Sequence, residues 1–258
     1  MEQRMKIIDM HSHLFYNRGV ESEKRKILVA CEKYGISEAY VSALAGFYPS
    51  EDEVSELNLS VAAFSRENPG LIKGYVYLSP EHKNALSVLS RGIEDMDMIG
   101  AKIWVSEYCD SACMDPIAEK LIEYNLPLLV HAFKKSTDQC AKESTALNVG
   151  NLAKRYPRLK IIMAHVGGNC YHGVPLVRGL SNVWVDLSGS TGRTNEIEYT
   201  LENLGDKRVL FGSDMPGCSF AVPYGKVLEA DIEEAARRKI LYENAVRLFD
   251  RTLGVKEI

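Results

Sequence analysis

Two histidines separated by one residue lie near the start of this 258-residue chain, in the stretch IIDMHSH. On a β-strand, residues two apart point to the same face, so His11 and His13 would present both imidazoles to one side. Neutral imidazoles that converge on one point are typical ligands of a transition-metal ion. The doublet alone could equally be a pair of surface or turn histidines, because short motifs often match by chance.

Further residues of the metal-binding types close later apolar segments of the chain. His131 ends LPLLVH, His165 ends KIIMAH and Asp214 ends VLFGSD. In a barrel of parallel strands, the carboxyl ends of all strands meet at one rim, whatever their distance in sequence. Four of the six histidines and one acid would share that rim, which favours a metal site over unrelated core histidines.

Eight short apolar segments alternate with segments of helical periodicity. The predicted strands are Lys6–His13, Glu38–Leu44, Ile72–Leu78, Ala101–Ser106, Pro127–Ala132, Lys160–Val166, Val183–Ser188 and Arg208–Ser213. Helices are predicted over Glu53–Glu67, Asp115–Tyr124 and Leu147–Tyr156, and Ile232–Phe249 is expected to form two helical pieces. The near-continuous hydrophobicity of the strands favours parallel strands that are covered on both faces.

This alternation predicts an α/β protein, a (β/α)8 TIM barrel formed by a single domain over residues 1–258. An open doubly wound sheet is the alternative. It is disfavoured because no Gly-x-Gly-x-x-Gly turn follows the first strand.

The bulk composition excludes several classes of partner. The net charge is −4 and no basic run stands out, so we expect a small-molecule substrate and no nucleic acid. No apolar run approaches the roughly 20 residues of a membrane-spanning helix, so no membrane partner is expected. The N-terminus lacks the apolar stretch of a secretory signal, which predicts a cytoplasmic location. The six scattered cysteines are then expected as reduced thiols.

Seven motifs together resemble one family. From Ile7 to Phe249 the chain is similar to the amidohydrolase superfamily, in the branch called amidohydrolase-related or amidohydrolase 2. That branch includes aminocarboxymuconate-semialdehyde decarboxylase and uncharacterised TIM-barrel metal-dependent hydrolases. The matching pieces are IIDMHSH, GAKIW, LPLLVHA, YPRLKIIMAHVGG, VWVDLSG, RVLFGSDMP and ENAVRLF.

The resemblance implies a divalent metal, usually zinc, and often a homodimer. Its implied ligands are His11, His13, His131 and Asp214, while His165 would orient or polarise substrate or water. Imidazoles and a carboxylate suit Zn²⁺ in a site that keeps one position open. Asp214 and His165 are the expected catalytic residues, the first as acid and base and the second beside a developing oxyanion.

Lys102 in GAKIW leaves the number of metal ions open. In two-metal members of the superfamily, a carboxylated lysine at this place bridges both ions, and His131 and His165 hold the second one. The alternative is an ammonium that pairs with a rim carboxylate or with a substrate acid. We favour one metal ion per chain, because a strand-four lysine alone is a weak motif.

Other rim residues are candidates for lesser roles. Arg193, Tyr16, Arg18 and Trp104 are candidate substrate contacts, although Trp104 could simply pack in the barrel. The planar guanidinium of Arg193 suits a substrate carboxylate. Asp186 in VWVDLSG is expected as a structural acid or as the support of a metal-binding histidine.

The predicted function is metal-dependent hydrolysis of an amide, ester or lactone bond of a small molecule by a metal-activated water. The alternative is metal-dependent, non-oxidative decarboxylation of an unsaturated or aromatic carboxylic acid. Hydrolysis is favoured because the loops are short for a barrel, whereas decarboxylases of this kind tend to be longer. An inactive barrel that only binds a ligand is a third hypothesis, although no expected ligand residue is missing.

Overall fold

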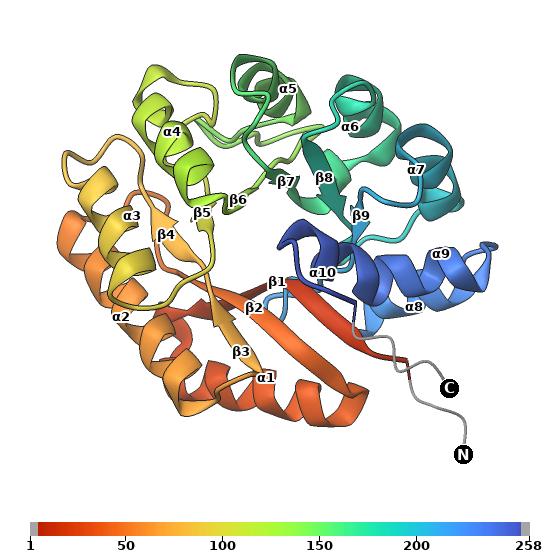
Figure 1. Ribbon diagram of the computed structural model, residues 1–258, viewed down its shortest axis with the longest axis horizontal. Helices are drawn as coiled ribbons and strands as arrows, with labels where there is room; N and C mark the ends of the chain where they lie inside the picture. Colours follow the sequence, from red (N-terminus) through yellow and green to blue (C-terminus); the bar gives the residue numbers. More distant parts are fainter. Residues whose placement is uncertain (1–4, 254–258) are drawn as a thin grey trace.

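The computed structural model describes residues 5–253, so the two ends of the predicted 1–258 domain lie outside the described residues. Parallel strands form an inner ring and helices surround it (Figure 1). The strands are β1 Ile7–Phe15, β2 Ile36–Leu44, β3 Ile72–Gly74, β4 Val76–Leu78, β5 Ala101–Ile103, β6 Leu128–Val130, β7 Ile161–Met163, β8 Val183–Asp186 and β9 Val209–Leu210.

The predicted strand Ile72–Leu78 is divided at Tyr75 into β3 and β4. At this point the chain changes its partner: Tyr75 N donates to Val41 O in β2, whereas Val76 N donates to Gly100 O just before β5. The hydrogen bonds of one extended segment therefore join the β1–β2–β3 sheet to the β4–β9 sheet. Each of the eight predicted strands has a counterpart in the ring.

Backbone hydrogen bonds also close the ring between its last strand and its first. Met10 N donates to Phe211 O at 3.0 Å, and Ser12 forms a parallel bridge with Met215. The predicted (β/α)8 barrel is therefore confirmed. Because its strands are parallel, their carboxyl ends lie at one rim.

The α-helices of the described residues are α1 Val20–Tyr34, α2 Glu51–Glu67, α3 Ala85–Glu94, α4 Asp115–Tyr124, α5 Ala146–Arg155, α6 Cys170–Val177, α7 Glu196–Leu204, α8 Ala221–Glu229, α9 Glu234–Arg238 and α10 Asn244–Leu248. Those predicted over Glu53–Glu67, Asp115–Tyr124 and Leu147–Tyr156 are α2, α4 and α5. Helix α2 begins two residues earlier than predicted, because Ser50 and Glu53 form a reciprocal capping box.

The two helical pieces predicted over Ile232–Phe249 are present as α9 and α10. Helices α9 and α10 are joined without a break by a π-helical turn over Lys239–Glu243. The carbonyl of Ile240 accepts from Phe211 N in the barrel wall, a bond that accompanies this wider turn. Helix α10 then packs Val246 and Leu248 against the apolar residues inside the barrel. It lies at the amino ends of the strands, where Lys160, just before β7, donates to Leu248 O at 2.8 Å.

A β-bulge in β1 directs the two N-terminal histidines into the barrel. Ile8 and Met10 belong to the inner apolar cluster, so strict alternation would turn His11 and His13 outward. The pairing with β2 shifts between Asp9 and Ser12, where β1 has one extra residue. Such a bulge reverses the alternation, so both histidines face inward.

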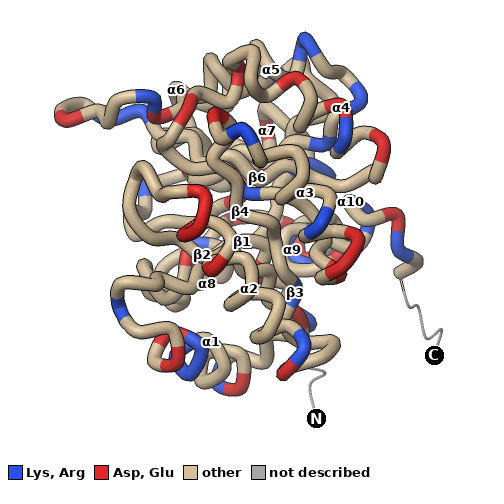
Figure 2. The backbone as a smooth tube through the Cα atoms, turned by 90° about the vertical axis from the view of Figure 1, so that its left-hand side faces the viewer, with Lys and Arg blue, Asp and Glu red and all other residues tan. Residues whose placement is uncertain are grey.

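Charges of both signs are spread over the surface. In Figure 2, Lys and Arg are intermixed with Asp and Glu on the outer helices and loops in view. Among the described residues, no helix combines the length and the apolar character needed to cross a membrane.

Asn58 of α2 provides hydrogen-bond partners for backbone groups of β4 at the junction of the two sheets. Its Oδ1 accepts from Tyr77 N at 2.8 Å and its Nδ2 donates to Tyr77 O at 3.0 Å.

We expect Asn58→Ala to lower the free energy of unfolding by about 2–4 kcal/mol, because two buried backbone groups lose their partner. Urea denaturation would measure this loss. Asn203→Ala, which removes one bond to Tyr199 O in α7, is the control, with a loss of about 1 kcal/mol or less. Equal losses in the two variants would contradict this role of Asn58.

Candidate metal centre and active site

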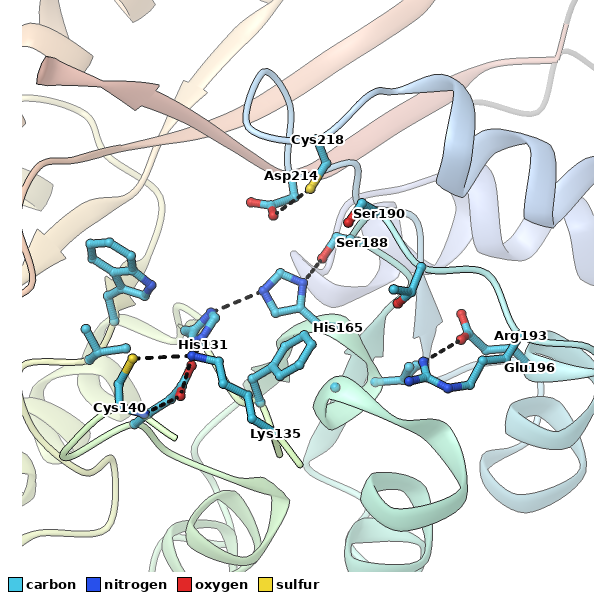
Figure 3. A pocket seen from close by; sticks show the side chains of 18 of the residues that line it. His131, Lys135, Cys140, His165, Ser188, Ser190, Arg193, Glu196, Asp214 and Cys218 are labelled. Carbon is cyan, nitrogen blue, oxygen red and sulfur yellow. Dashed lines mark hydrogen bonds and ion pairs between the residues drawn. The ribbon is translucent and has the colours of Figure 1, made fainter. Parts of the chain in front are cut away.

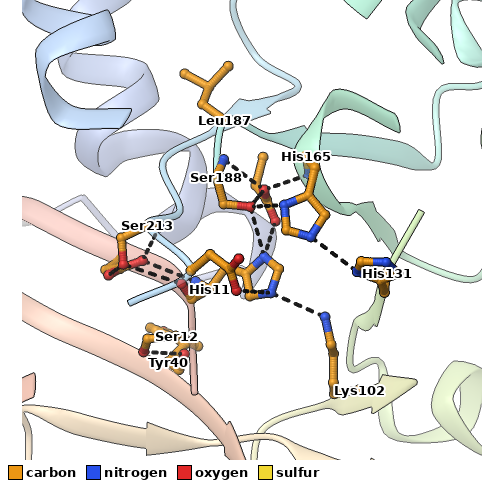
Figure 4. A network of polar contacts seen from close by, with 12 residues as sticks. His11, Ser12, Tyr40, Lys102, His131, His165, Leu187, Ser188 and Ser213 are labelled. Carbon is orange, nitrogen blue, oxygen red and sulfur yellow. Dashed lines mark hydrogen bonds and ion pairs between the residues drawn. The ribbon is translucent and has the colours of Figure 1, made fainter. Parts of the chain in front are cut away.

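His11, His13 and Asp214 converge at the rim of the barrel. Figure 4 shows His11 within the network of polar contacts at this rim. The Nε2 atoms of the two histidines are 2.9 Å apart. Asp214 Oδ1 lies 3.2 Å from His13 Nε2 and 3.8 Å from His11 Nε2. Three of the four predicted ligand residues are thus brought together by the fold.

The hydrogen-bond partners of the Nδ1 atoms of His11 and His13 show which ring nitrogen carries the proton. His11 Nδ1 lies 2.9 Å from Asp186 Oδ2, and a carboxylate only accepts, so His11 carries its proton on Nδ1. His13 Nδ1 lies 2.9 Å from Ser42 Oγ and 3.4 Å from the Ser42 carbonyl. With Nδ1 as the donor in both rings, the two Nε2 atoms present lone pairs to each other and to Asp214. This cluster of electron-pair donors fits a divalent cation.

The electrostatics keep these groups in their metal-binding forms. Burial lowers the pKa of His13 to about 4, so the imidazole is neutral at pH 7. Burial alone would raise the pKa of Asp214, but the contact with His13 and the other nearby imidazoles hold it well below its usual range. Neutral imidazole and ionised carboxylate are the forms that bind a metal ion.

His131 and His165 form a second pair of histidines in the same cavity. His131 Nδ1 lies 3.2 Å from His165 Nε2. His131 Nε2 donates to Glu143 Oε1 at 2.9 Å, and His165 Nδ1 lies 2.8 Å from Ser188 Oγ. Because the Ser188 hydroxyl donates to Asp186, it accepts from His165. His131 Nδ1 and His165 Nε2 therefore both present lone pairs to the cavity, and His131 lies outside the group formed by His11, His13 and Asp214.

Lys102 lies between the two histidine pairs. It is fully buried on β5, and its Nζ is 3.2 Å from His11 Nε2. Burial lowers its pKa to about 8, against the attraction of Asp214 and Asp186. The ammonium form thus places a positive charge beside the cluster, at the place where a two-metal site would need a carboxylated lysine.

A cavity of about 320 Å³ opens above these residues (Figure 3). Phe47, Trp104 and Phe133 contribute aromatic surface, and Lys135 and Arg193 contribute positive charge. Phe47 and Trp104 meet edge to face with ring centroids 5.0 Å apart. Two of the candidate substrate contacts, Trp104 and Arg193, therefore line the cavity.

The other two candidate contacts, Tyr16 and Arg18, are not among the residues that line this cavity. Tyr16 is exposed and donates to Glu56, and the Arg18 guanidinium lies over the Phe15 ring. Both follow β1 at the rim, but their side chains are engaged elsewhere. Sequence position at a strand end therefore does not decide which side chains reach the cavity.

Sequence reasoning missed several residues that contact the site. Ser188 follows Asp186 by two positions in VWVDLSG, and that spacing could have pointed to it. Glu143 lies in a loop with no recognisable motif, and Ser42 lies within an apolar strand. Cys218 Sγ is 3.3 Å from Asp214 Oδ2, and nothing in the sequence signals this contact.

A parallel barrel with a His and Asp cluster at its carboxyl rim is the framework of a metal-dependent enzyme. The amidohydrolase family matches residues 8–251, so the chain belongs to this family, as the motifs predicted. Membership of this family indicates an enzyme that uses a divalent metal ion, in agreement with the group formed by His11, His13 and Asp214.

Three solved structures show the same fold. A 2,6-dihydroxybenzoate decarboxylase from Rhizobium has a TM-score of 0.76 and 18% identity, over 96% of this chain and 99% of that one. A dihydroxybenzoic acid decarboxylase from a Polaromonas species, solved with manganese and the inhibitor 2-nitroresorcinol, has a TM-score of 0.77 and 18% identity, over 95% and 97%. A Staphylococcus aureus protein described as an amidohydrolase has a TM-score of 0.75 and 16% identity, over 95% and 99%.

Metal analysis of single variants tests the centre. We expect His13→Ala to lose nearly all of the bound zinc or manganese, because one of three convergent ligands is removed. Elemental analysis after reloading and gel filtration would measure the ions per chain. The exposed His172, replaced in His172→Ala, is the matched control and should keep the wild-type content. Full metal content in His13→Ala would contradict this assignment.

Proposed function

We propose that this protein is a metal-dependent, non-oxidative decarboxylase of a flat aromatic or unsaturated carboxylic acid. The observation that carries the proposal is the composition of the cavity, in which aromatic side chains and the loosely paired Arg193 lie beside the neutral histidines His131 and His165. The two decarboxylases of the same fold support it further. This is the alternative that the sequence left open, and it now has more support than hydrolysis.

The aromatic walls suit a planar substrate. Trp104 and Phe47 lie edge to face on one side, and Phe133 lies 5.8 Å from His165 between ring centroids. Planar rings gain from offset or edge-on contacts with such side chains. A planar acid could therefore lie between these rings with its carboxylate directed at the floor.

Arg193 is our candidate for recognition of a negative charge on the substrate. Its guanidinium is 3.9 Å from Glu196 Oε2, a loose contact, while Lys226 holds the other oxygen of Glu196 at 2.7 Å. The Arg193 side chain is one-third exposed, lines the cavity and lies beside Glu196 (Figure 3). Its planar donors can pair with a carboxylate through two parallel hydrogen bonds.

His11, His13 and Asp214 would hold one divalent ion, with His131 as the further ligand implied by the family. Such an ion supplies a Lewis acid that orients the substrate and stabilises developing negative charge. Zinc remains the metal predicted from the ligands, and manganese is the metal of the Polaromonas structure.

The proton steps then fall to Asp214 and His165. Decarboxylation breaks the bond between the ring carbon and the carboxylate, releases CO₂ and requires a proton at that carbon. We assign its delivery to Asp214, which lies at the cavity wall: the carboxylate, ionised at neutral pH, would take a proton from solvent and pass it to that carbon. His165 Nε2, a lone-pair acceptor, would accept a hydrogen bond from a substrate hydroxyl.

Hydrolysis of an amide, ester or lactone is the second candidate. Asp214 supports it, because its carboxylate lies at the cavity wall beside His13, where it could accept a proton from an attacking water. Both reactions would use the same floor, so products must distinguish them.

A reaction in D₂O separates the candidates. We expect a panel of hydroxybenzoic and unsaturated acids to include a substrate that releases CO₂ and gains one deuterium at the vacated carbon. NMR of the products would measure this. Asp214→Asn should lower the rate by roughly 10²–10⁴, since it removes the proton carrier. Asp52→Asn on exposed α2 should not change it. Turnover of esters, amides or lactones alone would favour hydrolysis, and ligand binding without turnover would favour an inactive barrel.

The number of ions is tested through Lys102. With one ion per chain, Lys102→Met should keep the wild-type metal content, because the lysine contributes no ligand. Elemental analysis of both proteins would show this. Two ions in the wild type that fall to one or none in the variant would instead indicate a carboxylated, bridging lysine.

A further inference from the structure

Each of the four rim histidines has one nitrogen occupied by a protein partner. Three of these partners belong to the barrel wall: Asp186 contacts His11, Ser42 contacts His13 and Ser188 contacts His165. In all three cases Nδ1 is the occupied nitrogen and Nε2 is directed at the site. His131 is the exception, because Glu143 occupies Nε2.

Glu143 is built into the loop between β6 and α5. It is only 3% exposed, although it carries a charge. Burial alone would raise its pKa, but the hydrogen bonds from His131 and Lys135 lower it to about 2. Four donors converge on its two oxygens: His131 Nε2 and Lys135 Nζ at 2.9 Å, Gln139 Nε2 at 2.7 Å and Cys140 N at 3.1 Å.

Because Glu143 is ionised, its carboxylate can only accept a hydrogen bond from His131. The imidazole must therefore carry its proton on Nε2. Its Nδ1 is then a lone pair, 3.2 Å from His165 Nε2.

We propose that Glu143 is a positioning residue that fixes His131 in the Nε2–H tautomer and so directs Nδ1 into the active site. His131 thereby acts in the opposite tautomer to His11, His13 and His165. The β6–α5 loop supplies for His131 the support that β8 supplies for His11. This inference concerns the site on which the proposed function rests, but it does not depend on the reaction.

A different role for Glu143 would be to anchor Lys135 at the cavity rim. The two roles are separable, because Glu143 Oε1 contacts His131 and Oε2 contacts Lys135. Lys135→Met removes the ion pair and keeps the acceptor for His131. Glu143→Ala removes both.

The test is the tautomer of His131 in metal-free protein, measured by long-range ¹H–¹⁵N correlation with ¹⁵N-labelled histidine. His131→Asn assigns the signals. We expect the Nε2–H form in the wild type and in Lys135→Met. In Glu143→Ala we expect an averaged spectrum with a substantial Nδ1–H population. Glu107→Gln, which alters a carboxylate paired with Lys142, is the matched control and should resemble the wild type.

A second readout is metal affinity by competition with a chelating dye. Loss of a hydrogen-bonded support commonly weakens metal binding 10–100-fold, and we expect this for Glu143→Ala but not for Glu107→Gln. If Glu143→Ala does not fold, Glu143→Gln replaces it in both measurements, with a mixed tautomer expected because the amide can also donate. A wild-type tautomer in the folded Glu143 variant, or an Nδ1–H form in the wild type, would overturn the proposal. Absence of decarboxylation would leave these results unaffected and would count only against the proposed reaction.

Discussion

The arrangement of this site depends on the buried carboxylate of Asp186. One oxygen is 2.9 Å from His11 Nδ1, and the other accepts from the backbone N–H groups of His165 and Ser188, each at 3.0 Å. Burial would raise its pKa, but His11 and the other donors hold it far below the usual range. An unpaired charge at this depth would cost several kcal/mol, so these donors must stay in place. One carboxylate thus fixes residues from β1, from the segment after β7 and from the segment after β8.

One group also serves two neighbours where β1 meets the segment after β9. The carbonyl of His11 accepts from Ser213 N at 3.2 Å and from Asp214 N at 2.7 Å. Asp214 adopts a φ of 61° and His165 a φ of 58°, which L-residues rarely do. Such conformations cost about 1–3 kcal/mol each and persist where the surrounding structure enforces them. The bonds that close the barrel therefore also hold a candidate ligand in an otherwise unfavourable conformation.

The floor of the cavity indicates metal binding, whereas its walls indicate the kind of substrate. The floor of neutral imidazoles and an ionised carboxylate suits a metal ion and is compatible with hydrolysis and with decarboxylation alike. The walls, with Trp104, Phe133 and the loosely held Arg193, are what favour a planar acid. Function therefore has to be argued from the loops above the barrel rather than from the fold.

The barrel, its parallel strands and the strand ends that carry His11, His13, His131, His165 and Asp214 could be predicted from the sequence, because hydrophobic periodicity and motif spacing are local properties of the chain. Asp186 was predicted as a structural acid or as the support of a histidine. The bulge in β1, the division of a strand at Tyr75 and the contact of Glu143 with His131 could not be predicted. They arise from pairing and packing between segments far apart in the chain, and only the tertiary structure decides which polar groups share one buried space.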